Sequence, residues 1–123
     1  MRHGFIGRRL NRRPDQRKRL LRSLMGALFR HDHITTTEAR AKELRRHAER
    51  LITTARRGDL HSRRLALSTL PDPPAVERLF HTVAPRYKER PGGYTRITRI
   101  GRRQGDGATV VQIELLDREP ATS

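Results

Sequence analysis

The feature that most constrains this chain is its uncompensated positive charge. Its 123 residues include 28 Lys and Arg against 13 Asp and Glu, which gives a formal net charge of +15. Like charges repel one another and oppose compaction, and hydrophobic residues, which must outweigh that repulsion, make up only 33% of the chain. The sequence therefore predicts a small core and a partner that carries negative charge.

Composition and length exclude several classes of protein. The length suits one compact domain with flexible ends. The chain has no cysteine, so disulfides, thiolate metal sites and cysteine nucleophiles are excluded. No stretch approaches the roughly 18 apolar residues of a membrane span, and the basic start leads into more arginine, not into the apolar run of a signal peptide. We therefore expect a cytoplasmic protein with no membrane partner.

The charge is unevenly distributed along the chain. Residues 1–30 hold ten Lys and Arg and only one acid, Asp15. Residues 1–13 have too few apolar positions to bury anything and include Gly4 and Gly7, so they are predicted to form an extended basic arm that orders on a partner. Residues 14–117 are predicted to form a single α+β domain, and residues 118–123 a disordered tail.

Four helices are predicted between residues 14 and 85. Pro14 suits the first position of a helix that runs to residue 31. Thr35 and Glu38 are spaced as a capping box for a second helix, and Gly58 suits its C-terminal stop. Asp59 is the expected N-cap of a third helix, which ends near residue 69. A fourth begins after Asp72 and ends at Pro85.

Apolar spacing predicts which side of each helix is buried. The first helix has a stripe of Leu20, Leu21, Leu24, Met25 and Leu28. The second has Ala41, Leu44, Ala48, Leu51, Ile52 and Ala55, and the fourth has Val76, Leu79, Phe80 and Val83. The arginines of the second helix are expected elsewhere on the surface, and they are Arg40, Arg45, Arg46, Arg50, Arg56 and Arg57.

The last third of the domain has the composition of strands. Residues 94–100 and 109–116 are rich in β-branched residues and are predicted to pair as antiparallel strands. Between them, residues 101–107 form a glycine-rich loop that begins with Arg102 and Arg103. Because two strands are marginal alone, residues 34–36 are expected to join them. The predicted fold is thus α+β, with about four helices packed on one face of a small antiparallel or mixed sheet of two to three strands.

Nothing in the sequence predicts catalysis. His31 and His33 form the only close histidine pair, and Asp32 is the only further ligand type nearby, so no metal site is expected. The serines lack a nucleophile elbow, and no acidic cluster suits magnesium. We expect no enzyme activity, no cofactor and no small-molecule substrate.

The unbalanced charge favours a nucleic-acid partner, and the layout favours RNA. The sequence shows no helix-turn-helix spacing and no heptads, which DNA readers commonly use. An arm and a basic loop on a small α+β body instead suit a folded RNA, which is contacted by separate pieces through its shape, its phosphates and its 2′-hydroxyls. A nucleoid-type DNA-binding protein remains an alternative, as does a metal-dependent nuclease.

The candidate RNA contacts lie in the arm, on the first helix and around the predicted hairpin. They are Arg2, His3, Arg8, Arg9, Asn11, Arg12, Arg13, Arg17, Lys18, Arg22, Arg96, Arg99, Arg102 and Arg103. Alternation along the strand places Arg96 and Arg99 on opposite faces. Tyr94 offers a ring for base stacking, but packing against the helices is the favoured interpretation.

Several runs of residues resemble one known family over nearly the whole chain. They include Met1-Arg2-His3, Gly7-Arg8, Ile34-Thr35-Thr36-Thr37, Ala41-Lys42-Glu43-Leu44-Arg45, Leu51-Ile52 and Arg63-Arg64-Leu65-Ala66. The most specific are Ala84-Pro85-Arg86-Tyr87 and Gly92-Gly93-Tyr94-Thr95-Arg96-Ile97. In these runs the sequence is similar to the bacterial large-subunit ribosomal proteins of the L-seventeen family. It departs from their pattern at Gly4, Gln16 and Ser23.

The resemblance implies an α+β fold and a place on the large ribosomal subunit near the peptide exit side. It also implies binding to large-subunit ribosomal RNA beside neighbouring ribosomal proteins, with no catalytic activity. These implications agree with the expectations drawn from charge and layout.

Overall fold

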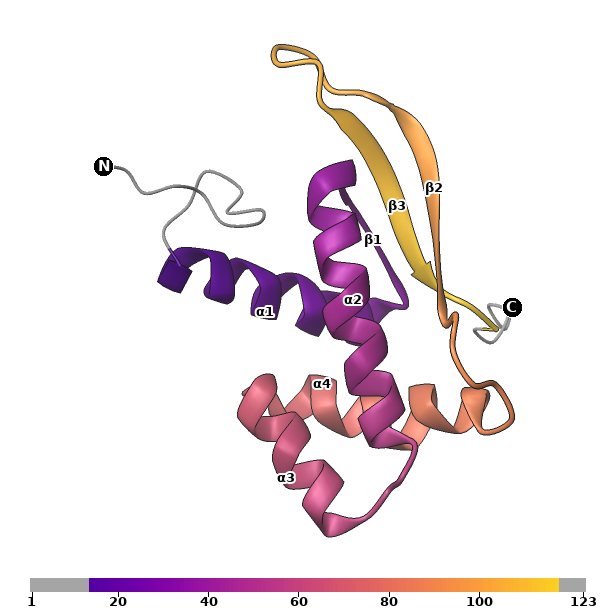
Figure 1. Cartoon of the computed structure of the whole chain (residues 1–123). Coiled ribbons are helices and arrows are strands. Elements are labelled where there is room, and N and C mark those ends of the chain that lie inside the picture. The colour runs from indigo at the N-terminus through magenta and orange to yellow at the C-terminus, as the bar shows by residue number, and fades with distance from the viewer. Residues whose placement is uncertain (1–13, 118–123) are drawn as a thin grey trace.

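The computed structural model of the protein describes residues 14–117. The element order is α1 (Pro14–His31), β1 (His33–Thr37), α2 (Glu38–Ala55), α3 (Leu60–Thr69), α4 (Pro73–Arg78), a π-helical turn (Leu79–Val83), a 3-10 turn (Ala84–Tyr87), β2 (Thr95–Arg102) and β3 (Thr109–Leu115). Within this part of the chain, four helices pack on a three-stranded antiparallel sheet (Figure 1). The predicted α+β fold is confirmed.

The sheet has the strand order β1-β3-β2, so the segment around residues 34–36 does join the hairpin. Ile34 and Ile97 both pair with Ile113, and this row packs against the core of the protein. Because side chains alternate between the faces of a strand, the neighbouring row, which includes Arg96 and Glu114, lies on the opposite face. The helices therefore cover one face of the sheet, as predicted.

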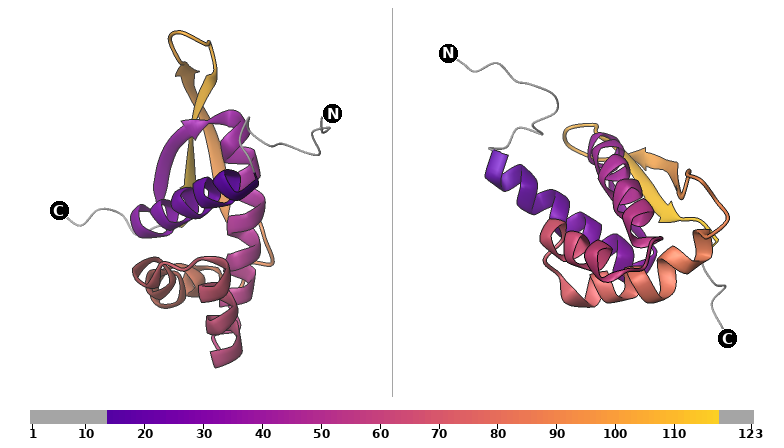
Figure 2. Two further views of the ribbon diagram at one scale, coloured as in Figure 1. Left: turned by 90° about the vertical axis from the view of Figure 1, so that its left-hand side faces the viewer. Right: turned by 60° about the horizontal axis from the view of Figure 1, so that its bottom comes forward.

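Helix α2 connects the two ends of the molecule. In Figures 1 and 2 it runs from the sheet at one end to α3 and α4 at the other. Its predicted apolar residues are all buried, and they are Ala41, Leu44, Ala48, Leu51, Ile52 and Ala55. The spacing of three and four residues therefore predicted the buried side of this helix correctly.

Two predicted helix caps are confirmed, and one is wrong. The carboxylate of Asp59 accepts a hydrogen bond from the Ser62 N–H at the start of α3, and Asp72 caps α4 in the same way. The capping box of Thr35 and Glu38 does not form. Instead β1 continues through Thr37, which pairs with Val110, so α2 begins at Glu38. Pairing with β3 holds Thr36 and Thr37 in extended backbone, so no helix can begin directly after Thr35.

The end of the fourth helix also differs from the prediction. The α-helical part stops at Arg78, and the chain continues through the π-helical and 3-10 turns to Tyr87. The Ala84 N–H donates to the carbonyl of Leu79, which is the wider spacing of a π-helix. Pro85 has no N–H to continue the α-helical pattern, so it changes the type of turn here and does not end the segment. The predicted apolar residues of the segment are still buried.

Candidate nucleic-acid interface

The predicted contacts fall into a part that the structure describes and a part outside it. The arm residues Arg2, His3, Arg8, Arg9, Asn11, Arg12 and Arg13 lie outside the described residues. The remaining candidates lie on α1 and on the β2–β3 hairpin, where their partners can be examined one by one.

On α1, the three candidate cations differ in what they contact. Arg17 Nη2 lies 2.6 Å from Oε2 of Glu43, a carboxylate with a side chain only 4% exposed. Arg22 Nε donates to the backbone carbonyl of Thr69 at 3.2 Å. The exposed Lys18 has no side-chain hydrogen bond or ion pair within residues 14–117. Of the three, only Lys18 has a charge that no described residue pairs with.

The strand arginines of the hairpin point to opposite faces, as predicted. Arg96 Nη2 lies 2.8 Å from Oε1 of Glu114 on the open face of the sheet. Arg99 is paired across the sheet with the buried Val111 and reaches Glu38 of α2 at 3.5 Å. Both guanidinium groups are exposed and weakly held, because ion pairs at the surface contribute about 0–1 kcal/mol.

The hairpin loop presents one unpaired cation and one paired cation. Arg103 forms an ion pair with Asp106, and the Ala108 N–H donates to the same carboxylate. The hydrogen bonds from Arg103 and then from the Ala108 backbone lower the pKa of Asp106 to about 2. Arg102 is exposed and has no such partner in the described residues. The ion pair between Arg103 and Asp106 joins two positions of the loop. The guanidinium of Arg102 has no ion-pair partner in the described residues.

Tyr94 packs in the core, which confirms the favoured interpretation and excludes base stacking in this fold. Its side chain is 1% exposed, and its ring centroid lies 4.9 Å from that of Tyr87. The Tyr94 hydroxyl accepts a hydrogen bond from Arg56 Nη1 at 3.0 Å. Arg56 and Arg45 were expected on the surface, but both are half-buried. Arg45 Nε donates inward to Oγ1 of Thr95.

The half-buried carboxylate of Asp32 joins two further arginines into a structural cluster. Asp32 lies between α1 and β1 and accepts hydrogen bonds from Arg78 and Arg86 at 3.0–3.3 Å. Burial alone would raise the pKa of Asp32, but the hydrogen bonds from Arg78 and Arg86 outweigh it and lower the pKa below 3.8. These two arginines hold the end of α1 against the end of α4 and against the 3-10 turn.

Six exposed cations have no side-chain hydrogen bond or ion pair within residues 14–117. They are Lys18, Arg50, Arg57, Arg64, Lys88 and Arg102, and the half-buried Arg40 and Arg63 have none either. Only Lys18 and Arg102 were among the sequence candidates. Helical spacing marks Arg50 and Arg57 as surface residues, but it does not reveal which arginines the acidic residues neutralise.

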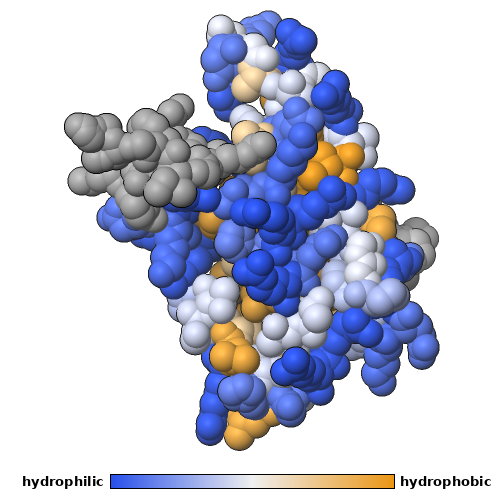
Figure 3. Space-filling model, in the orientation of Figure 1, coloured by the Kyte–Doolittle hydropathy of each residue, from blue (hydrophilic) through white to orange (hydrophobic). Residues whose placement is uncertain are grey.

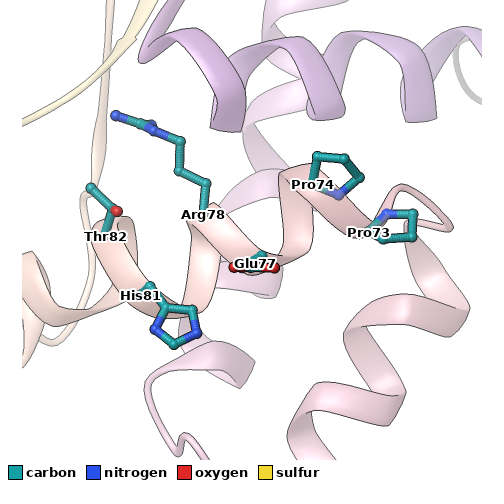
Figure 4. A pocket seen from close by; sticks show the side chains of 6 residues that line it. All are labelled: Pro73, Pro74, Glu77, Arg78, His81 and Thr82. Carbon is teal, nitrogen blue, oxygen red and sulfur yellow. The ribbon is translucent and has the colours of Figure 1, made fainter.

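The hollow drawn in Figure 4 is lined by the prolines that start α4 and by Glu77, Arg78, His81 and Thr82. Arg78 extends away from Glu77 and His81 in this view, and its guanidinium bonds to Asp32. Within residues 14–117 there is no group of three or more side chains that could hold a metal ion. No helix there is long and apolar enough to cross a membrane.

The fold and its surface define a class of small, basic α+β proteins in which some arginines pack into the fold and others are exposed. Comparison with known proteins narrows this class. The model of the family described as "Ribosomal protein L17" matches residues 20–116. The chain belongs to this ribosomal protein family, which confirms the resemblance seen in the sequence. Its homologues are structural proteins of the ribosome, and they are not enzymes.

Individual relatives match over most of their own length. A protein of Anaeromyxobacter dehalogenans named "Large ribosomal subunit protein bL17" is 49% identical over 123 residues, which cover 100% of this chain and 76% of the relative. Proteins of the same name from Pelobacter propionicus and Caldanaerobacter subterraneus are 50% and 55% identical. The matches cover 97% and 89% of this chain, and 94% and 97% of those relatives.

Proposed function

We propose that this protein is a structural component of the large ribosomal subunit that binds folded large-subunit ribosomal RNA and so supports translation. The observation that carries the proposal is the match over all 123 residues to a large ribosomal subunit protein. The net charge of +15 supplies the physical reason, because each phosphate that is neutralised releases counterions. Neighbouring large-subunit proteins are the further partners, and the ribosome is the proposed location.

The proposed contacts are the arm, the basic side of α1 and the hairpin. Lys18 and Arg102 have free charges in the described fold, whereas Arg96 and Arg99 hold only exposed pairs. Phosphate oxygens can replace such exposed carboxylate partners at little cost. Arg17 and Arg22 already donate hydrogen bonds to Glu43 and to the carbonyl of Thr69. Any contact they make with RNA would use their remaining guanidinium N–H groups.

The affinity of the purified protein for large-subunit ribosomal RNA is expected to fall steeply with salt. The slope of log affinity against log salt should be about −0.7 to −0.9 for each phosphate contact. Titration at several salt concentrations measures this slope, and the protein should co-sediment with large subunits from a lysate. A salt-independent affinity contradicts the proposal. Equal affinity for duplex DNA would favour the nucleoid alternative, and RNA cleavage that requires added metal would favour the nuclease.

Replacing Arg102 and Arg103 together by alanine should flatten the salt dependence by up to about two contacts while leaving the fold intact. The loop is exposed, so the melting temperature should change little. Asp106→Ala is the matched control, because it removes the partner of Arg103 but keeps both arginines. If the double variant binds with unchanged affinity and slope, the hairpin loop is not a contact surface. If Asp106→Ala weakens binding equally, loop shape matters more than charge.

A further inference from the structure

One side of α2 carries a row of basic residues that the candidate contacts did not include. The row, called here the α2 basic stripe, consists of Lys42, Arg46 and Arg50 of α2 and Arg57 of the turn that follows it, all exposed. The spacing of four residues places Lys42, Arg46 and Arg50 on one side of the helix. At a rise of about 1.5 Å per residue, this helical part of the stripe is roughly 12 Å long. Figure 3 shows hydrophilic side chains along the line that α2 follows in Figure 1.

Two of the three acidic residues of α2, Glu43 and Glu49, bind mainly to other elements of the fold. Glu43 is 4% exposed and contacts Arg17 of α1 at 2.6 Å. Glu49 accepts hydrogen bonds at 2.9–3.1 Å from the backbone of Tyr94 and from both the backbone and the hydroxyl of Thr95. The fold therefore uses these two carboxylates to hold α1 and β2 against α2. Neither is placed to neutralise Arg50 or Arg57.

The remaining pairs of the stripe are long and exposed. Lys42 lies 3.8 Å from Glu38, and Arg46 lies 3.5 Å from the buried Glu43. The side chains of Lys42 and Arg46 are 57% and 68% exposed. Arg50 and Arg57 have no side-chain hydrogen bond or ion pair within residues 14–117, and Arg57 interacts with Asp59 only electrostatically. Solvated helices usually mix signs at this spacing, whereas like charges four residues apart destabilise a helix.

We propose that the α2 basic stripe is a separate RNA contact, along which the sugar–phosphate backbone of one RNA segment lies. This inference rests on the proposed function and adds a surface to it. The first turn of α2 and Arg103 of the hairpin line one hollow, so the stripe begins beside the loop and leads away from it. Phosphates along a strand suit a row of cations such as this one, and the guanidinium groups in it can donate two hydrogen bonds to one phosphate. A contact of this kind needs no base readout.

The test compares two variants of the full chain that lose the same charge. Arg50→Gln/Arg57→Gln removes the two arginines of the stripe that form no hydrogen bond or ion pair in the described residues. In the control, Arg64→Gln/Lys88→Gln, two exposed cations that also lack partners in the described residues are removed from other places. Glutamine is a good helix former, so both variants should fold, and far-UV circular dichroism and the melting temperature check this.

The stripe variant is expected to reduce the salt slope of ribosomal RNA binding by about 1.4–1.8, which corresponds to two lost contacts. It should also lose footprint protection over one RNA segment, while the control keeps the wild-type slope and footprint. The inference is overturned if the stripe variant binds like the wild type or if both variants lose the same affinity. Normal RNA binding with weaker assembly into subunits would indicate a protein partner and would also overturn it. A wild-type protein without salt-dependent binding would instead contradict the proposed function.

Discussion

Replacing Asp32 by alanine is expected to lower the free energy of unfolding by about 3–5 kcal/mol, because it leaves buried positive charge without a partner. Arg86 has a side chain only 8% exposed, and Arg78 is 29% exposed. Both guanidinium groups bond to the same carboxylate. Asp32 also has a φ of 72°, a backbone conformation that aspartate tolerates better than alanine. Urea unfolding followed by circular dichroism measures the loss.

Two further variants keep this prediction testable if Asp32→Ala does not fold. Asp32→Asn retains a residue suited to positive φ, so its loss of stability reports the lost charge and acceptor oxygen without added backbone strain. Combining it with Arg86→Met removes the buried charge that was left unpaired, and part of the stability should return. Asp15→Ala is the control, because the pair of Asp15 and Arg19 is exposed and should contribute at most about 1 kcal/mol. Equal losses for Asp32→Ala and Asp15→Ala would contradict the prediction.

The same cluster gives the stability a defined dependence on pH. The pKa of Asp32 is lowered in the folded protein despite its burial, because Arg78 and Arg86 donate hydrogen bonds to the ionised form. The contribution of Asp32 is therefore fully present above its unfolded pKa of about 3.9, and it is lost as the pH falls through the lowered folded value. In Asp32→Asn this part of the acid destabilisation should be absent.

Removing residues 2–13 is expected to weaken ribosomal RNA binding far more than it lowers the melting temperature. The deleted arm has five arginines, Arg2, Arg8, Arg9, Arg12 and Arg13. If each contacts a phosphate, the salt slope should fall by up to about 3.5–4.5. The arm has few apolar residues to bury, so little stability is expected to depend on it. Affinity across a salt series and thermal unfolding of the same samples measure the two effects.

A full-length variant with these five arginines changed to glutamine separates charge from length. It should bind RNA as weakly as the truncated chain if the arm acts through its charge. In NMR spectra of the free wild-type protein, the arm should give sharp resonances with little dispersion. Rigid, dispersed arm resonances would contradict this prediction, as would a truncated protein that binds with an unchanged slope.

Local patterns alone determined most of the elements of this protein. The spacing of apolar residues in α2 predicted its buried side, because a helix with 3.6 residues per turn repeats its faces whatever lies beside it. Asp59 and Asp72 predicted the starts of α3 and α4, because a cap needs only the backbone of the next turn. The strands of the hairpin followed from their β-branched residues in the same way.

Contacts between distant residues decided the remaining features. Thr35 and Glu38 have the spacing of a capping box, but pairing with β3 extended β1 through Thr37. Arg45 and Arg46 are neighbours in the sequence, yet Arg45 donates to Thr95 while Arg46 faces solvent. Whether the charge of an arginine stays unpaired depends on whether the fold places a carboxylate beside it. The sequence alone therefore determined the elements and the excess of charge. The tertiary structure decided where that charge is exposed, because ion pairing depends on distances between residues far apart in the chain.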